Sequence, residues 1–303
     1  MKKFFVSVLL LVTAVGTTSA QLLYKISGNG LEKPSYIMGT FHLMEKDLLK
    51  SVKSLKTVMQ EVDQFCGELD INEVQKCATL LQQKSPNALP NGVTLKDLFT
   101  EKQFAQINNC AKKVLGTNFD ENPELLQIFG KYEPMVFGGV LNTAILNRFI
   151  KDPNNFTPLD VILLMSGQEL GKKIIGLETA EFQVGILTHS APLKQQKKML
   201  MNVVERWDGT CKAIDTWAEA YKRQDMKSMQ ALINNNDLKA LLFGSKDVHK
   251  QLLTKRDADW AKRIPGIMKQ QSTFFFVGVA HLAGKPGVLT LLRKQGYTVE
   301  PVQ

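Results

Sequence analysis

The stretch SYIMGTFHL, residues 35–43, is an apolar run that ends in a glycine and reaches His42 three residues later. A second stretch of the same form, FFFVGVAHL at residues 274–282, places His281 in the same setting near the other end of the chain. The chain has four histidines in 303 residues, and two of them follow this GxxH pattern. We expect both apolar runs to be strands of one sheet, because glycine lets the backbone turn sharply where a strand ends.

The residues around the first stretch predict the start of an α/β unit. QLLYKIS, residues 21–27, precedes it across a turn rich in Gly and Pro, which indicates a hairpin. Apolar residues then recur at steps of three and four over residues 44–62, a pattern typical of an amphipathic helix. QFCGELD, residues 64–70, predicts the next strand, so the order is strand, helix, strand, as in a βαβ-type unit.

The end of the chain repeats this order, and the middle is mostly helical. After the second GxxH stretch we expect a turn, a helix over LTLLRKQ (289–295) and a strand in GYTVEPV (296–302). KKIIGLE, residues 172–178, predicts a short strand within a region that is otherwise helical. The fold class is therefore α/β (α+β), with duplicated strand-helix units that form a central sheet, a large helical insert and two GxxH motifs at strand ends. The lack of a short-period repeat excludes a solenoid or propeller.

The first 20 residues predict a signal peptide. A positively charged start, Lys2 and Lys3, precedes an apolar run over residues 4–15 and a small-residue cleavage site that ends at Ala20. The apolar run is shorter than the about 20 residues that span a bilayer, and no other segment approaches that length. We expect one mature domain over residues 21–303, periplasmic or secreted, with no transmembrane segment after signal cleavage.

The composition is that of an ordinary globular protein, with 44% hydrophobic and 22% charged residues. Without the two lysines of the signal peptide the formal net charge is about +7. The lysines are scattered along predicted helices, with no aromatic-interleaved basic stripe and no Cys/His finger spacing. We therefore expect no nucleic-acid partner.

The four cysteines are Cys66, Cys77, Cys110 and Cys211, and none of them stands in a CxxC pair. An oxidising compartment permits disulfides among them, in any of three connectivities. Buried free thiols agree equally well with the sequence.

The two GxxH motifs predict a site at the carboxyl edge of the sheet, where open α/β sheets bind ligands. His42 and His281, delivered there by two strands, are candidates to share one metal ion. A catalytic first-row metal ion usually has about three protein ligands, so a carboxylate is needed. Glu68 and Glu178 each end a predicted strand, and either completes a His/His/Glu set with the other as base or outer partner. Taken singly, these residues also fit structural histidines and helix-start carboxylates.

Three further residues were weighed for the site. Arg256 in TKRDADWAKR presents a guanidinium to a carboxylate or a substrate oxyanion, or else forms a surface ion pair with Asp257 or Asp259. His189 and His249 lack the GxxH setting and are expected at helix ends or on the surface, outside the site.

Five motifs in order resemble the TraB/GumN family, relatives of the Tiki metalloproteases: SYIMGTFHL, QFCGELD, IIGLETAEFQ, TKRDADWAKRI and FFFVGVAHLAGKPGVLTLLRKQGYTV. The resemblance runs over roughly the whole of residues 21–303. It implies a duplicated α/β fold in which the GxxH motifs and a glutamate build a divalent-metal site, used in the Tiki branch for peptide-bond cleavage. On this chain the implied metal ligands are His42, His281 and Glu68, with Glu178 and Arg256 as further polar site residues. The family often has Arg followed by Asn where this chain has an Asp at position 257, which leaves the role of that position open.

The leading prediction is an exported metal-dependent hydrolase of the peptidase type, acting on a peptide or small-molecule substrate. His42 and His281 would ligate the ion, Glu68 would ligate or act as base, and Glu178 and Arg256 would share the catalytic work. Manganese, cobalt or zinc suits such a set, and there is no HExxH motif. The alternatives are a non-catalytic envelope protein that binds haem or metal through the same histidines, and a structural protein in which the GxxH motifs only hold strands together.

Overall fold

The computed structural model describes residues 21–42, 44–83, 88–150, 152, 156–189, 191–243 and 246–302. The predicted signal peptide, residues 1–20, lies outside the described residues. Within this described part of the chain, no helix combines the length and the apolar character that crossing a membrane requires.

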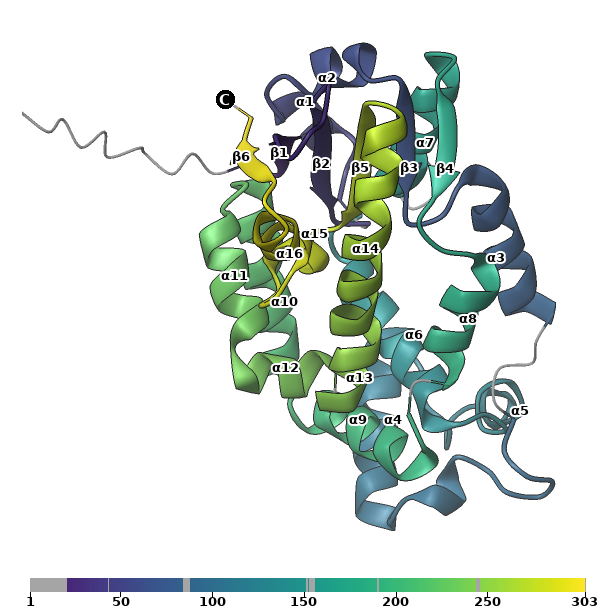
Figure 1. The fold of residues 1–303 in the computed structure, drawn as a ribbon. Helices are drawn as coiled ribbons and strands as arrows, with labels where there is room; N and C mark the ends of the chain where they lie inside the picture. The colour runs from purple at the N-terminus through teal and green to yellow at the C-terminus, as the bar shows by residue number, and fades with distance from the viewer. Residues whose placement is uncertain are drawn as a thin grey trace, which may run out of the picture.

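Six strands of the described chain form one mixed sheet in the order β4-β3-β5-β2-β1-β6 (Figure 1). The strands are β1 (Leu23–Ser27), β2 (Ser35–Thr40), β3 (Gln64–Gly67), β4 (Lys173–Gly176), β5 (Thr273–Gly278) and β6 (Thr298–Pro301). β1 pairs antiparallel with β2 and with β6, which confirms the predicted hairpin, whereas β2, β5, β3 and β4 run parallel. The four parallel strands therefore end at one edge of the sheet, as the motif positions predicted.

The two GxxH stretches lie side by side although more than two hundred residues separate them. In the β2–β5 pairing Gly39 stands opposite Val277 and Thr40 opposite Gly278, so the motifs are offset by one residue. A Cβ on Gly39 would lie 2.8 Å from a methyl group of Val279, so no larger residue fits there without displacement. His42 follows β2 in a non-helical segment, whereas His281 lies within the short helix α15 (Val279–Ala283) that begins directly after β5.

The first crossover differs from the single helix predicted over residues 44–62. It contains α1 (Asp47–Ser51) and α2 (Leu55–Glu61), separated because Val52 is extended and Ser54 has a left-handed backbone with φ of 59°. This break lets both Val52 and Leu55 be buried in the core around the sheet. The following strand is also shorter than QFCGELD: it ends at Gly67, so Glu68 stands just beyond the sheet edge.

The helical insert is confirmed and falls into two segments of the chain. Between β3 and β4 lie α3 (Ile71–Gln83), η1 (Lys96–Leu98), α4 (Glu101–Leu115), α5 (Glu124–Ile128), α6 (Pro134–Asn147) and α7 (Leu159–Glu169). Between β4 and β5 lie α8 (Ala180–His189), α9 (Leu193–Glu205), α10 (Trp207–Lys222), α11 (Met226–Asn234), α12 (Asn236–Phe243), α13 (Lys246–His249), the π-helical turn η3 (Lys250–Thr254) and α14 (Lys255–Gln270). The helix α16 (Val288–Lys294) precedes β6 as predicted.

Two hydrophobic cores support this arrangement. One surrounds the sheet and contains the aromatic residues of β5 and Trp260 of α14. The other lies among α4, α6, α9 and α10, around Phe137 and Leu141, and Figure 1 shows these helices packed below the sheet. The mixed α/β class predicted from the sequence is confirmed, and the duplication of strand-helix units stays a prediction.

All four cysteines are free thiols in the structure. Cys66 and Cys110 are buried and the other two are partly buried. Of the two interpretations left open by the sequence, the structure therefore agrees with free thiols.

Candidate functional site

The five residues singled out from the sequence lie at one place, the carboxyl edge of the parallel strands. They are His42, Glu68, Glu178, Arg256 and His281, contributed by the segments after β2, β3 and β4, by α14 and by α15. A Cβ built on Gly278 would lie 3.4 Å from Glu68 Oε1, 3.6 Å from His281 Cδ2 and 3.9 Å from His42 Nε2. A side chain at position 278 would therefore occupy the space that these three side chains share.

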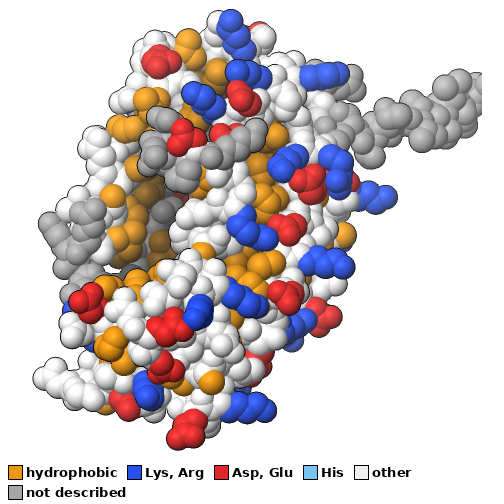
Figure 2. Space-filling model, turned by 180° about the vertical axis from the view of Figure 1, so that it is seen from behind, with side chains coloured by type: hydrophobic (Ala, Val, Ile, Leu, Met, Phe, Trp, Pro, Cys, Tyr) orange, Lys and Arg blue, Asp and Glu red, His pale blue; other side chains and the backbone are white. Residues whose placement is uncertain are grey.

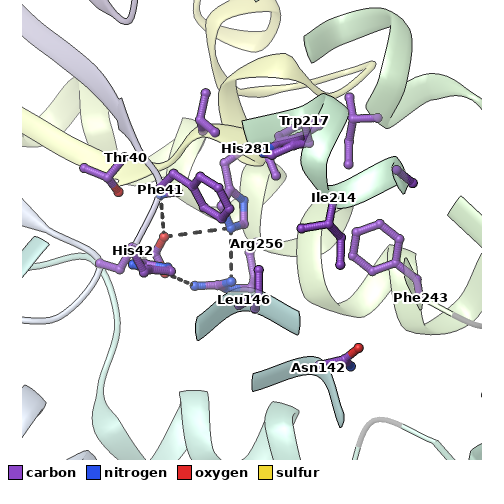
Figure 3. Close-up of a pocket in the computed structure, with 16 residues that line it drawn as sticks. Thr40, Phe41, His42, Asn142, Leu146, Ile214, Trp217, Phe243, Arg256 and His281 are labelled. Carbon is purple, nitrogen blue, oxygen red and sulfur yellow. Dashed lines mark hydrogen bonds and ion pairs between the residues drawn. The ribbon is translucent and has the colours of Figure 1, made fainter. Parts of the chain in front are cut away.

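Arg256 is the hub of the site (Figure 3). Its Nη2 donates to Glu68 Oε2 at 2.5 Å and to Glu178 Oε2 at 2.8 Å, and its Nε donates to Glu178 Oε1 at 2.9 Å. Its Nη1 lies 3.1 Å from Nε2 of His281. The surface ion pair considered as an alternative is wrong, because Arg256 pairs with these two glutamates whereas Asp259 pairs with Arg263.

The charge on Glu68 follows from these contacts. Burial alone would raise the pKa of this carboxyl, but Arg256, His281 and His42, together with the Gly278 N–H at 2.8 Å, lower it to about 2. The pKa of Arg256 is in turn raised by the two glutamates against the opposing effect of burial. Glu68 is therefore a carboxylate at every physiological pH.

Glu178 is held from several sides. Trp260 Nε1 donates to Glu178 Oε1 at 2.9 Å, and the Arg256 guanidinium lies 4.7 Å from the centre of the Trp260 ring. Gln183 Nε2 donates at 3.1 Å both to Glu178 and to Glu68, so the two carboxylates share one amide as well as one guanidinium.

At the two helix starts beside these glutamates, other carboxylates accept from the backbone N–H groups. Asp70 Oδ1 accepts from the backbone N–H groups at the start of α3, and Glu73 Oε2 accepts from the Ala180 N–H at the start of α8. Thr179 Oγ1 accepts from the Phe182 N–H at 3.4 Å, also at the start of α8.

His42 is oriented by a carboxylate that the sequence did not indicate. Its Nδ1 contacts Asp160 Oδ2, and Thr40 Oγ1 donates to the other oxygen of Asp160 at 2.5 Å. The Asp160 carboxylate raises the pKa of His42 to about 9, although 57% of the histidine side chain is exposed in the cleft. With Nδ1 engaged, Nε2 is the ring nitrogen that faces the shared space beside Gly278.

His281 has a matching partner. Its Nδ1 lies 2.6 Å from Asp257 Oδ1, and both side chains are almost completely buried. Burial raises the pKa of Asp257, while His281 and Arg256 act in the opposite direction. Asp257 thus provides the acceptor on Nδ1 of His281, whose Nε2 lies near Arg256 and Glu68.

Four partners were missed from the sequence: Asp160, Asp257, Gln183 and Trp260. Gln183 lies in the motif IIGLETAEFQ and Asp257 and Trp260 in TKRDADWAKRI, so the motifs contained a signal for three of them. Asp160 lies 118 residues from His42 at the start of α7 and looks like a helix-start acid, so no local signal marked it.

Of the two histidines expected outside the site, His249 lies outside the cluster. His249 ends α13 and stacks edge-on against Phe243, with ring centres 5.0 Å apart. The His189 side chain lies outside the described residues, and its backbone ends α8.

The imidazole and carboxylate groups of the site are of the kinds that bind a divalent ion. The Arg256 guanidinium, however, lies among them. Each imidazole has a carboxylate on Nδ1, the outer partner that histidine ligands commonly have. Nε2 of His281 lies 3.9 Å from Glu68 Oε1, and Nε2 of His42 faces the space beside Gly278. Across the described ranges, however, no group of three or more His, Cys, Asp or Glu side chains is placed so as to hold a metal ion. An ion held by His42, Glu68 and His281 would therefore need a different arrangement, since Arg256 Nη1 lies 3.1 Å from His281 Nε2 here.

The cluster forms one end of a cleft with a volume of about 360 Å³. Thr40, Phe41, His42, Glu68, Arg256, Gly278 and His281 line it on the sheet side, and side chains of α6, α10, α11 and α12 line the opposite side. Figure 3 shows the two histidines and Arg256 facing Ile214, Trp217 and Phe243 across this space. Seen from behind, the molecular surface is hollowed and hydrophobic side chains border the hollow (Figure 2).

Comparison with known proteins gives a family match and distant relatives. The model of the TraB/PrgY/gumN family matches residues 22–301. A protein named "Metalloprotease TIKI homolog" from Amphimedon queenslandica is 22% identical over 305 residues, which cover 88% of this chain and 59% of that protein. "Metalloprotease TIKI2" from Danio rerio is 23% identical, over 88% of this chain and 58% of its own length. The chain thus spans less than two thirds of these relatives, and no solved structure gives a significant match.

Proposed function

This chain belongs to the TraB/PrgY/gumN family, and on that premise we propose that it is a metal-dependent hydrolase that cleaves peptide bonds outside the cytoplasm. The observation that carries the proposal is the pair of imidazoles, each with a carboxylate on Nδ1, that lie with Glu68 around the space beside Gly278. The names of the two similar proteins support a peptidase over other hydrolases. The predicted signal peptide supports the location, periplasmic or secreted.

In this proposal Nε2 of His42, Nε2 of His281 and the Glu68 carboxylate hold the ion. Manganese, cobalt or zinc suits such a mixed nitrogen and oxygen set. A divalent ion in this place supplies Lewis acidity for the hydrolysis of a carbonyl compound. Because the pKa of Glu68 is about 2, this residue is better suited to ligate than to accept a proton near neutral pH.

The other residues orient and stabilise. With an ion bound, Asp160 and Asp257 would accept from Nδ1–H of the two imidazoles, which would leave each Nε2 to ligate. Glu178, fixed by Trp260, anchors the Arg256 guanidinium at the edge of the cleft. From there Arg256 would stabilise negative charge that develops on the scissile carbonyl oxygen.

The test is metal-dependent cleavage by the purified mature protein, residues 21–303. A mixed peptide library is incubated with Mn²⁺, Co²⁺ or Zn²⁺ in turn, and again with chelator. We expect cleavage that is lost with chelator and restored by one of the ions. His42→Ala, His281→Ala and Glu68→Gln should each lower metal content and reduce cleavage by roughly 100-fold or more.

His249→Ala is the matched control, because this histidine lies outside the cluster and should leave both readouts unchanged. If the folded wild-type protein cuts nothing with any of the ions, the hydrolase proposal fails. If haem gives a Soret band with the wild-type protein but not with His42→Ala or His281→Ala, the result would instead support the non-catalytic alternative, an envelope protein that binds haem. If the wild-type protein binds no metal and the His42→Ala and His281→Ala variants do not fold, the results would support the structural alternative, in which the GxxH motifs only hold strands together.

A further inference from the structure

The cleft beside the proposed metal site has a second, chemically different wall. The side chains that form it come from helices of the insert and are apolar: Leu146, Ala213, Ile214, Trp217, Ile233 and Phe243. In Figure 3, Ile214 and Phe243 lie across the cavity from His42 and Arg256. This wall has no part in the proposed chemistry, so it needs a separate explanation.

Charge favours an uncharged occupant. Among the described residues that line the cavity, the ionisable side chains are His42, Glu68, Arg256 and His281, all at the sheet edge. Glu68, Arg256 and His281 are engaged with one another, and His42 with Asp160. The helical wall contributes Asn142 as its one polar side chain within the described lining. A charged group placed against this wall would lose its hydration without gaining a partner, whereas an apolar group loses nothing.

Size and continuity limit the occupant further. The cleft volume of about 360 Å³ lies near the lower end of the range for small-molecule sites, which accommodates one large side chain and the adjoining main chain. Val279 and Ala280, which directly precede His281 in α15, line the same cavity as the helical wall and the polar cluster. A side chain packed against the wall is therefore attached to main chain that lies at the polar cluster.

We infer that the helical wall of this cleft selects a large apolar side chain, aromatic or branched aliphatic, at a substrate residue next to the scissile peptide bond. The inference rests on the proposed function for the position of the scissile bond. The apolar preference of the wall itself rests only on its lining, so binding and cleavage are tested separately.

The binding arm uses fluorescein-labelled peptides of one sequence in which a central residue is Phe, Leu, Gly, Asp or Lys. Their affinities for the wild-type protein are measured by fluorescence polarisation in the presence of chelator, so that no turnover occurs. The Phe and Leu peptides should bind at least about 10-fold more tightly than the Asp and Lys peptides. The cleavage arm measures kcat/KM for the same five peptides with the activating ion, and the same order is expected.

Ala213→Trp tests the wall directly, because this residue lines the cavity from α10 and the larger ring would fill it. Lys212→Trp is the matched control, since Lys212 is the exposed neighbour and does not line the cavity. Ala213→Trp should remove most of the apolar preference, and Lys212→Trp should keep it. Asn142→Trp, an exposed position on the rim, repeats the test if the first variant does not fold.

The outcomes separate the two proposals. Equal affinities for all five peptides, or an unchanged preference in folded Ala213→Trp and Asn142→Trp, would overturn the inference. Cleavage without an apolar preference overturns it too and leaves the proposed function standing. A preference in binding without cleavage by any ion supports the wall as a side-chain site and refutes the hydrolase proposal.

Discussion

Replacement of Asp257 separates the orientation of His281 from the stability of the fold. Asp257 is 1% exposed, and its Oδ1 lies 2.6 Å from Nδ1 of His281. Asp257→Ala leaves the buried imidazole N–H without an acceptor, which costs about 1–3 kcal/mol of unfolding free energy. Asp257→Asn keeps the shape and an oxygen acceptor but removes the negative charge.

The amide variant is expected to spare the fold and to weaken the metal site. The folded-state pKa of Asp257 lies above its ordinary value because the carboxyl is buried, so its ionisation at neutral pH costs stability. Asp257→Asn removes this cost, and we expect an unfolding free energy within about 1 kcal/mol of the wild-type value, or higher. Loss of the outer carboxylate should lower metal affinity by about 10- to 100-fold, equivalent to about 1.4–2.7 kcal/mol.

The assay pairs urea unfolding of the metal-free protein with calorimetric titration of Mn²⁺, Co²⁺ and Zn²⁺. Asp259→Asn is the control, because this exposed carboxylate two residues along the same helix pairs with Arg263 and does not contact His281. Wild-type metal affinity in Asp257→Asn would refute the orienting role. Equal losses of stability in the Ala and Asn variants, with no separate effect on metal affinity, would show that position 257 acts only in the fold.

Three further predictions concern the metal-free protein. Burial raises the pKa of Cys66 well above that of an ordinary thiol, so iodoacetamide at about pH 8 should modify it in urea but not in the folded protein, as mass spectrometry of the digested chain would reveal. The Asp160 carboxylate raises the pKa of His42 from 6.5 to about 9, so this pair stabilises the fold fully below about pH 6.5 and the contribution is lost as pH rises through about 9. Asp160→Asn should abolish that pH-dependent part of the unfolding free energy, which solvent screening keeps small. If the variant keeps the wild-type dependence of unfolding free energy on pH, the prediction is wrong. Trp260→Phe removes the indole N–H that donates to Glu178 and should lower the unfolding free energy by about 1.5–3 kcal/mol; a change below about 0.5 kcal/mol in urea unfolding would argue against a stabilising bond there.

The sheet was predictable because its elements are encoded locally. A hairpin needs only two apolar runs and a turn between them, and the residues of β1 and β2 supply both. The break in the first crossover was not predictable, because the apolar spacing over residues 44–62 is compatible with one continuous helix. The left-handed Ser54 is decided by how Val52 and Leu55 are buried against the sheet, which is a property of the packed molecule.

The candidate site shows the same division. Paired motifs at strand ends were enough to single out His42, His281, Glu68 and Glu178, because parallel strands of one sheet bring their carboxyl ends to a common edge. Arg256 was also singled out, but the sequence did not decide its partner. A carboxylate in the site and an aspartate beside it in the chain were both compatible with the sequence.

By itself the sequence determined the α/β class, the family and the candidate site residues at the sheet edge. Strand patterns and short motifs span only a few consecutive residues, so they can be recognised without the structure. Only the tertiary structure decided that Arg256 joins both glutamates, that Asp160 orients His42 across 118 residues, and that helices of the insert provide an apolar wall opposite the histidines. The physical reason is distance along the chain. A hydrogen bond or a cavity wall between remote segments depends on how whole elements pack, and no local pattern of residues records that packing.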